Sequence, residues 1–376
     1  MKVLISGAGI AGLALAGFLK DTGIEITIVE KSPELPTSGF SIGLWSNGRA
    51  MLKKLGISER LDEVGVPLKR LIVRDGKGRI MRDYRLSDFD VEFGSALLDV
   101  SRAKLLEWIY EAAGRPQVKY NCTIQRIHEF AHSVHVGLSD GSEGSYDLLV
   151  GADGVRSKVR ALTFGVPESY TDWRAWWIWI DASLGEAQTI TEYVEPGSFV
   201  VMFNEGTRTL AVLMARSNHV LWDDEAGRVE RLKEIFKRES YIVPHIFEGK
   251  VAKDIMPSDL MEIHMKRWHT ERVVLVGDAA HAFVPLAGLG GSMALEDTWI
   301  LAEELLKHKR DIPLALDLYE AKRKPRVARA RRLTAKMRAW GFVRSPFLRW
   351  VANIVVSRLP DKLIIRDYVA LMREEL

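Results

Sequence analysis

A glycine-rich turn near the N-terminus constrains the fold more than any other feature of the sequence. The pattern Gly7-Ala8-Gly9-Ile10-Ala11-Gly12 follows the short apolar run Lys2–Ser6 and opens a stretch rich in Ala, Leu and Gly that extends to Thr22. Alternating, β-branched residues follow at Ile24–Glu30. A strand, a glycine turn, a helix and a second strand within about 30 residues predict a βαβ unit with parallel strands.

This turn suits the phosphates of a dinucleotide. The first glycine permits a tight turn, the second lets the backbone approach a pyrophosphate, and the third lets the helix pack closely on the strand. The helix N-terminus adds free N–H groups and partial positive charge. Glu30 ends the second strand, where a carboxylate accepts hydrogen bonds from an adenosine ribose and repels a 2′-phosphate. A tight turn without a ligand is the alternative. The predicted cofactor-binding residues of this unit are Gly7, Gly9, Ala11, Gly12, Glu30 and Lys31.

A second glycine-rich unit, far along the chain, favours FAD over NAD. The apolar run Val273–Val276 leads into Gly277-Asp278, and a helix is expected from Ser292. Asp278 is placed to accept hydrogen bonds from sugar-like hydroxyls, with a helix cap or turn as the alternative role. The glycine turn before the helix directs backbone N–H groups at its ligand, which stabilises the negative charge of a reduced flavin. The predicted cofactor-binding residues here are Gly277, Asp278, Pro285, Gly288, Gly290, Gly291 and Ser292.

With these two units and one further motif, the chain resembles the class A flavoprotein monooxygenases, the family typified by para-hydroxybenzoate hydroxylase. The third motif is Asp147–Arg160, DLLVGADGVRSKVR, and it resembles the family's Asp-Gly motif. Residues Arg272–Glu303, RVVLVGDAAHAFVPLAGLGGSMALEDTWILAE, resemble its Gly-Asp motif and flavin-facing helix. The three motifs occur in order, and the resemblance spans about the first 330 residues.

The resemblance implies both cofactor contacts and a reaction. It implies that Arg102 contacts the cofactor, that Asp153 and Arg156 lie near the cofactor groove, where Arg156 helps to dock the nicotinamide, and that Gly39–Gly56 lies beneath the isoalloxazine ring. The alternative role for Asp153 and Arg156 is to secure a turn by hydrogen bonding. It also implies that NADPH or NADH reduces FAD, that O₂ adds at flavin C4a, and that the hydroperoxide hydroxylates an electron-rich ring. The alternatives on the same scaffold are an FAD-dependent reductase or halogenase, and a carrier of prenyl groups without catalysis.

The sequence departs from the family pattern at several positions. Leu289 and Ser292 stand where Gln and Asn are frequent, and Ala282 follows His281 where proline is usual. Trp177 falls roughly where many members carry arginine. These departures leave FAD binding expected and the substrate open.

An aromatic strand is the predicted wall of the substrate site. The region Thr171–Met214 lacks helical periodicity and is expected to form antiparallel sheet, with a hairpin turn at Asn204-Glu205-Gly206. Trp177 and Trp179 share one face of their strand and Trp176 the other. These tryptophans either line the substrate cavity with one face of the strand or serve only in the packing of the sheet. The substrate-pocket candidates are Trp177, Trp179, Phe203 and Met214.

The C-terminal region is strongly basic. Between Ala321 and Pro360 there are 12 Lys or Arg and no Asp or Glu, although the whole chain has a net charge of only +3. Such a helix can lie on an anionic membrane, pair with the more acidic remainder of the chain, or stay solvated. The basic stretch Lys322–Arg338 lacks the interleaved aromatic residues of a platform for nucleic-acid bases, so no nucleic-acid partner is expected.

Composition limits the remaining functions. The single cysteine, Cys122, excludes an intrachain disulfide and most cysteine-based metal sites, and no metal site is expected. No catalytic side chain is assigned, because the flavin carries the chemistry. With no signal peptide and no apolar run of about 18 residues, the protein is expected in the cytoplasm, with peripheral membrane contact through the basic segment left open.

The predicted fold class is α/β: a Rossmann-like FAD-binding domain with an inserted, mainly antiparallel substrate domain and C-terminal helices. The FAD-binding domain is expected to be discontinuous, at 1–67, 100–165 and 266–330. The substrate domain is expected at 68–99 and 166–265, and a C-terminal helical segment at 331–376, with Pro325, Gly341, Pro346 and Pro360 interrupting the helices from Leu314 onward.

Overall fold

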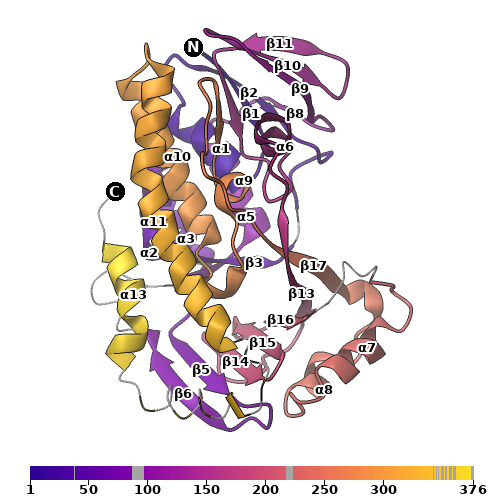
Figure 1. The fold of residues 1–376 in the computed structure, drawn as a ribbon. Helices are drawn as coiled ribbons and strands as arrows, with labels where there is room; N and C mark the ends of the chain where they lie inside the picture. The colour runs from indigo at the N-terminus through magenta and orange to yellow at the C-terminus, as the bar shows by residue number, and fades with distance from the viewer. Residues whose placement is uncertain are drawn as a thin grey trace.

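The computed structural model describes residues 1–37, 39–86, 97–216, 223–341 and 361–373, together with single positions between 342 and 360. Its first sheet contains five parallel strands, and four of them are those of the two predicted glycine-turn units and the Asp-Gly motif (Figure 1). The strand order is β18 (Val273–Leu275), β12 (Leu148–Gly151), β1 (Lys2–Ser6), β2 (Glu25–Val29) and β8 (Val118–Lys119). The strands β18 and β1 therefore lie two places apart, although most of the chain separates them in sequence.

Helices pack beside this sheet and carry the glycine turns. Helix α1 packs against both α5 and α10, and α10 packs in turn against α2 and α11. A small antiparallel sheet, β9 to β11, and helix α6 lie at the end of the molecule that holds the N-terminus (Figure 1). The elements are α1 (Ile10–Phe18), α2 (Ser46–Lys54), α3 (Ser58–Val64), α5 (Arg102–Ala112), β9 (Ile124–Glu129), β10 (Val134–Leu138), β11 (Glu143–Tyr146), α6 (Lys158–Phe164), α9 (Asp278–His281), η3 (Pro285–Ala287) and α10 (Gly290–Lys307).

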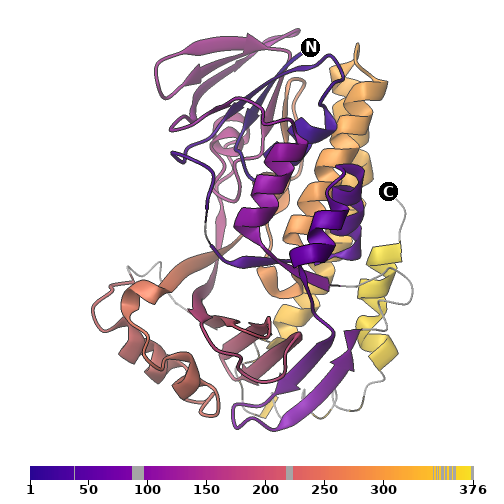
Figure 2. The ribbon, with the colours of Figure 1, turned by 180° about the vertical axis from the view of Figure 1, so that it is seen from behind.

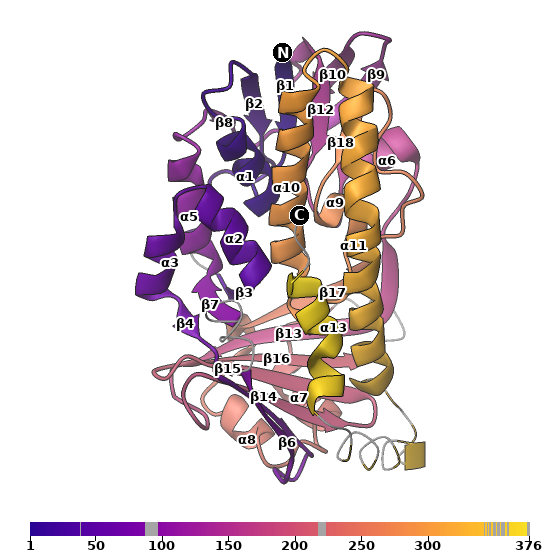
Figure 3. The ribbon, with the colours of Figure 1, turned by 90° about the vertical axis from the view of Figure 1, so that its left-hand side faces the viewer.

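The second large sheet has seven strands and lies across the far end of the helices (Figures 1 and 3). All its neighbouring strands are antiparallel except the parallel pair β14 and β5. The order is β17 (Ile255–Glu262), β13 (Ser169–Ile180), β16 (Thr209–Arg216), β15 (Ser198–Asn204), β14 (Thr189–Glu195), β5 (Arg70–Arg74) and β6 (Ile80–Arg85). The predicted hairpin at Asn204-Glu205-Gly206 is confirmed, since it joins β15 to β16.

One face of the seven-stranded sheet packs toward the helices that flank the parallel sheet, which we call the cofactor-side helices (α1, α2, α5, α10 and α11). The other face is covered by short helices that come from the chain between β16 and β17. The covering elements are α7 (Arg228–Ile235), α8 (Val243–Ile246) and η2 (Ala252–Asp254), seen on one flank in Figure 2. A second small sheet, β3 (Ser41–Trp45), β7 (Leu97–Ser101) and β4 (Val66–Pro67), lies between the two large sheets. The predicted α/β fold with an added antiparallel sheet is confirmed. The domain boundaries given above remain a proposal.

Two local predictions were wrong. The segment Ser145–Val150, which follows the turn signal Asp140-Gly141, is expected from its sequence to be one strand, but it contributes to two strands, β11 and β12, which belong to different sheets. The expected interruption at Pro325 is also wrong, because α11 (Ile312–Gly341) runs through it. Proline in a helix interior costs about 3 kcal/mol, but Arg323 and Arg326, on either side of it, form buried ion pairs with α10. Tertiary contacts thus hold the helix where local preference would end it. The other interruptions fall in or beside residues outside the described ranges, and α13 (Asp361–Arg373) follows them.

Candidate active site

The first glycine turn has three glycines with different surroundings. Gly7 adopts φ 109°, and its N–H donates to the Val29 carbonyl at 2.7 Å. A Cβ on Gly12 would lie 1.9 Å from the Gly7 carbonyl oxygen, so only glycine allows this contact between helix and turn. A Cβ on Gly9 would have no protein atom within 4 Å. Gly9 therefore faces open space at the N-terminus of α1, as a turn that admits a pyrophosphate requires.

Glu30 is held against the same turn. Its Oε2 accepts a hydrogen bond from the Ala8 N–H at 2.8 Å, and its Oε1 accepts one from the Ser32 N–H at 2.9 Å. The neighbouring Lys31 is exposed, and Ala11 is buried. The carboxylate is thus fixed at the carboxyl end of β2, beside the turn, where the sequence predicts contact with a ribose.

The two glycine-rich units converge. A Cβ on Gly277 would lie 3.6 Å from Cβ of Ala11 and 3.1 Å from Cβ of Ala294. Gly277 also has φ 58° and ψ −139°, a conformation that favours glycine. The Gly277-Asp278 turn therefore rests on α1, so both units open on the same side of the parallel sheet.

Asp278 is the open carboxylate of the second unit. The possible capping role is not observed, since its side chain caps no helix and no described residue hydrogen-bonds to it. The residue is accessible to water, yet protein atoms surround it on most sides, and this desolvation raises the pKa of its carboxyl. The positive charges of His281 and Arg102 act in the opposite direction. A Cβ on Gly290 would lie 3.9 Å from Oδ1 of Asp278. Arg102, Asp278 and the start of α10 thus lie near one another, and their contact with the cofactor stays a prediction.

In the turn before α10, some residues pack tightly against the segment Gly39–Gly56 and others are exposed to solvent. Gly288 has φ 61°, and Pro285 and Gly288 are exposed. A Cβ on Gly291 would meet Cδ1 of Ile42 at 2.6 Å, and Oγ of the buried Ser292 accepts a hydrogen bond from the Trp45 N–H at 3.2 Å. The segment Gly39–Gly56 therefore packs against this turn, where the resemblance implies a position beneath the flavin ring.

Asp153 has a structural role in the Asp-Gly motif. Its Oδ2 accepts hydrogen bonds from the N–H groups of Lys158 and Val159 at 2.8 and 3.2 Å, which secures the start of α6. Its Oδ1 is buried and has no hydrogen-bond partner. Arg156 is exposed, 3.9 Å from Asp259. The turn-securing role considered for this pair is observed for Asp153, and its contact with a cofactor stays a prediction.

Sequence reasoning missed Arg160, although it ends the Asp-Gly motif. The side chain is fully buried and donates to the carbonyls of Val155, Val166 and Ala279 at 2.7, 3.0 and 3.0 Å. Because Ala279 follows Asp278, Arg160 ties the Asp-Gly motif to the Gly-Asp motif. An arginine in that motif was visible, but its long-range partner was not.

A buried ionic network behind the second glycine turn was also missed. Asp297 of α10 accepts hydrogen bonds from the Gly277 N–H at 2.9 Å, from His281 Nε2 at 2.5 Å and from Arg323 Nε at 2.8 Å. The neighbouring Glu296 accepts two bonds from Arg326 and one from Asn47 Nδ2 at 2.7 Å. The arginines, with His281 for Asp297 and Asn47 for Glu296, lower the pKa of both carboxyls against the effect of burial. The network joins α2, α9, α10 and α11 behind the turn.

The substrate-pocket candidates lie on one face of the seven-stranded sheet. Trp177, Trp179, Phe203 and Met214 belong to the core beneath the cofactor-side helices, while Trp176 packs on the opposite face with Phe236 of the loop after α7. The ring of Trp177 lies 5.4 Å from that of Phe40, and Trp179 Nε1 donates to the Gly39 carbonyl at 3.2 Å. The predicted alternation is confirmed, and this face meets the segment that approaches α10.

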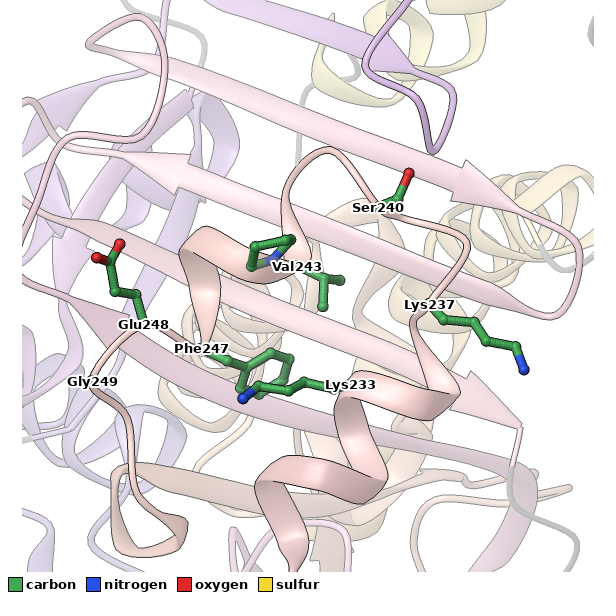
Figure 4. Close-up of a pocket in the computed structure, with 8 residues that line it drawn as sticks. Lys233, Lys237, Ser240, Val243, Phe247, Glu248 and Gly249 are labelled. Atoms are coloured by element: carbon green, nitrogen blue, oxygen red, sulfur yellow. The ribbon is translucent and has the colours of Figure 1, made fainter.

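A separate hollow beside α7 and α8 lacks these features (Figure 4). Its lining comes from one short stretch of chain on the covered face of the sheet: Lys233, Lys237, Ser240, Val243, Pro244, Phe247, Glu248 and Gly249. It shares no element with the glycine turns, so we do not assign it to the active site.

In the part of the basic segment that the structure describes, many side chains form ion pairs with the rest of the protein. Arg323 and Arg326 bind α10, Lys322 binds Glu304 at 2.8 Å, and Arg338 binds Glu262 at 2.8 Å. This is one of the arrangements that the sequence left open. Among the described residues, no helix is long and apolar enough to cross a membrane, and no group of His, Cys, Asp or Glu is arranged to hold a metal ion.

Two glycine turns that open on one side of a parallel sheet, with a free carboxylate and a helix N-terminus between them and the aromatic sheet, define a flavin-dependent oxidoreductase. The FAD binding domain family matches residues 1–334, and the chain belongs to that family. FAD is therefore its cofactor. The open space at Gly9 and the unpartnered Asp278 fit this group.

Relatives with known names narrow the class. The chain is 31% identical to the FAD-dependent urate hydroxylase of Klebsiella pneumoniae subsp. pneumoniae over 87% of both chains. It is 31% identical to aurachin C monooxygenase/isomerase of Stigmatella aurantiaca, over 86% of this chain and 85% of that one. The crystal structure of Klebsiella pneumoniae HpxO with FAD and uric acid matches with a TM-score of 0.89 at 27% identity, covering 99% of this chain and 96% of that chain. The protein is an FAD-dependent monooxygenase, the first of the functions that the sequence left open.

Proposed function

We propose that the protein hydroxylates a small aromatic or conjugated ring with NAD(P)H and O₂. The observation that carries this proposal is the aromatic face of the seven-stranded sheet, where Trp177 packs on Phe40 at the segment beside the second glycine turn. The named relatives include hydroxylases and monooxygenases of aromatic compounds, urate among them. In the balanced reaction, one oxygen atom of O₂ enters the ring and the other leaves as water, with two electrons from NAD(P)H.

The residues at the two turns have separable roles in this proposal. Gly9 and Glu30 hold the adenosine diphosphate half of FAD, with Lys31 at its edge. Asp278 and Arg102 hold the hydroxyl-bearing chain between the two halves. The N–H groups of Gly290 and Gly291, at the N-terminus of α10, would stabilise negative charge on the flavin ring. Bound FAD supplies the redox chemistry, taking a hydride from NAD(P)H and activating O₂.

The remaining residues orient the substrate and exclude water. Trp177, Trp179, Phe203 and Met214 provide an apolar surface on which a flat ring can lie. Exclusion of bulk water keeps activated oxygen from escaping as hydrogen peroxide. Arg160 and the Asp297 network fix the positions of the turns without contacting the substrate.

We also propose that the enzyme works in the cytoplasm with its basic segment docked on its own body. The ion pairs of Lys322, Arg323, Arg326 and Arg338 support docking over the membrane contact that the sequence left open. Binding of the purified protein to vesicles containing phosphatidylserine would contradict this assignment.

The function can be tested with the purified, yellow holoenzyme. Phenols, indoles, purines and quinolones are screened for faster oxidation of NADH and NADPH, with oxygen uptake and product mass measured together. We expect at least one compound to gain a single oxygen atom in proportion to the NAD(P)H consumed. If every compound that speeds NAD(P)H oxidation yields only hydrogen peroxide, and none is oxygenated, hydroxylation of these ring classes is wrong.

A further inference from the structure

A buried carboxyl on the seven-stranded sheet has no protein partner. Glu192 of β14 is only 8% exposed, and no described residue forms a hydrogen bond or ion pair with it. Its oxygens are nevertheless not among the unpaired atoms sealed completely from solvent. The Glu192 carboxyl oxygens are therefore accessible to a molecule the size of water. An unpaired buried carboxylate is costly to a folded protein, so a residue of this kind calls for a functional explanation.

Glu192 lies on the same sheet face as the substrate-pocket candidates. Its neighbours Ile190 and Val194 belong to the core on the cofactor side, whereas Tyr193 belongs to the other. Along one row of the sheet, Glu192 pairs with Val201, Val201 with Val212, and Val212 with Trp177. Three strand spacings separate Glu192 from Trp177, which is about 14 Å at about 4.8 Å each. The row is thus apolar between its ends, with a carboxyl at one end and an indole at the other.

The Glu192 end of this row lies near residues that contact the turn before α10. The negative charge of Glu192 contributes, after burial, to raising the pKa of Tyr368 on α13, so the two groups are close. The Tyr368 ring lies 4.8 Å from the ring of Trp45, and Trp45 Nε1 donates to the Ala287 carbonyl at 3.0 Å. Ala287 precedes Gly288 of the turn before α10. Tyr368 and Trp45 therefore connect the Glu192 end of the row to that turn.

A second buried carboxyl, that of Glu239, has a structural role and provides a comparison for Glu192. Glu239 is fully buried, contacts the other side of the sheet and hydrogen-bonds to Ser198. Burial raises the pKa of both Glu192 and Glu239 to about 7. The two residues differ in that Glu239 hydrogen-bonds to Ser198, whereas Glu192 has no hydrogen-bond partner among the described residues.

We propose that Glu192 binds the substrate by accepting a hydrogen bond from a ring N–H or phenolic O–H, and so selects donor-bearing aromatic rings over rings in which that donor is blocked. This inference rests on the proposed aromatic hydroxylation and adds the chemical class of its substrate. A carboxyl at this position also disfavours substrates that carry their own carboxylate there, because two like charges would be buried together. Glu192 is then a specificity-determining residue.

The test compares the binding of matched ring pairs to the holoenzyme. The pairs are indole and N-methylindole, phenol and anisole, and 4-quinolone and N-methyl-4-quinolone, with binding read from the change in flavin absorbance. We expect at least one donor-bearing member to bind about tenfold or more tightly than its methylated partner, because a hydrogen bond to a charged group contributes about 1.5–3 kcal/mol. In Glu192→Ala this ratio should fall toward one, and in Glu192→Gln it should fall part of the way.

Glu239→Gln is the matched control, since it also removes a buried carboxyl and should leave the ratio unchanged. Flavin content and melting temperature show whether each variant is folded, and Glu192→Gln serves if Glu192→Ala does not fold. Equal binding within every pair, no binding by any member, or a preference that survives in both Glu192 variants would overturn the role of Glu192. Oxygenation of the methylated rings as efficiently as their partners would overturn it too, while leaving the proposed hydroxylation intact.

Discussion

At the scale of single residues, the first glycine turn separates the needs of folding from those of cofactor binding. Gly9→Ala places a methyl group where no protein atom lies within 4 Å, at a backbone with φ −81° that alanine tolerates. We expect this variant to fold with an apoprotein stability within about 1 kcal/mol of the original and to lose most of its FAD. Flavin absorbance after gel filtration and thermal unfolding of both apoproteins give the two readings.

Gly12→Ala is the contrasting change. Its methyl group would lie 1.9 Å from the Gly7 carbonyl oxygen, so the helix must shift. We expect a loss of about 1–3 kcal/mol or more in the free energy of unfolding, because added volume in a packed site forces backbone movement. The assignment of Gly9 to the cofactor would be contradicted if Gly9→Ala kept its FAD, or if it were as unstable as Gly12→Ala.

A buried carboxyl away from the site predicts how stability changes with pH. Burial raises the pKa of Glu239 from the usual 4.5 to about 7, so the folded protein retains a proton that the unfolded chain releases. The stability that this site contributes is complete below the unfolded pKa and is lost as the pH rises through about 7. Glu239→Gln cannot ionise. We expect its melting temperature, relative to the original protein, to increase between about pH 5 and pH 8. A constant difference would show that Glu239 is already charged.

At the scale of elements, the paired arginines of α11 should matter far more than its exposed lysines. Arg323→Met leaves Glu296 and Asp297 buried with one cation fewer, and we expect it to destabilise the protein by about 3–5 kcal/mol. Lys336→Met breaks an exposed pair with Asp367, and we expect less than about 1 kcal/mol. Urea unfolding of both variants measures the difference. Similar values would mean that the buried network contributes little.

The elements also show what the sequence could predict. The βαβ unit, the turn at Gly288–Gly291 and the alternation of Trp176 and Trp177 follow from local patterns, because glycine geometry and strand periodicity are properties of neighbouring residues. The uninterrupted α11 does not, since its continuity past Pro325 depends on α10, which lies earlier in the chain. Arg160 and Glu192 were also missed, because their roles depend on tertiary structure. Arg160 binds carbonyl groups that are distant in sequence, and Glu192 is buried without a hydrogen-bond partner among the described residues.

At the scale of the whole molecule, the C-terminal helix α13 returns to the cofactor side and brings Tyr368 against Trp45. Tyr368→Ala removes that ring, and we expect water to enter beside the turn before α10. The fraction of consumed NAD(P)H recovered as hydroxylated product should fall, with a matching rise in hydrogen peroxide. Lys336→Met, which loosens α13 on its exposed side, is the control. An unchanged product fraction in Tyr368→Ala would show that α13 does not seal the site.

The long helix α11 has a consequence for how ligands enter. Near its middle, Arg323 and Arg326 bind α10 behind the flavin-side turn, and toward its end Arg338 binds Glu262 of β17 in the large sheet. It therefore links the two sheets, through buried ion pairs to α10 and a partly exposed ion pair to β17. We expect the entry of substrate and the exit of product to depend on small local displacements rather than on opening of the whole body. Cross-linking α11 to the sheet should consequently leave turnover intact.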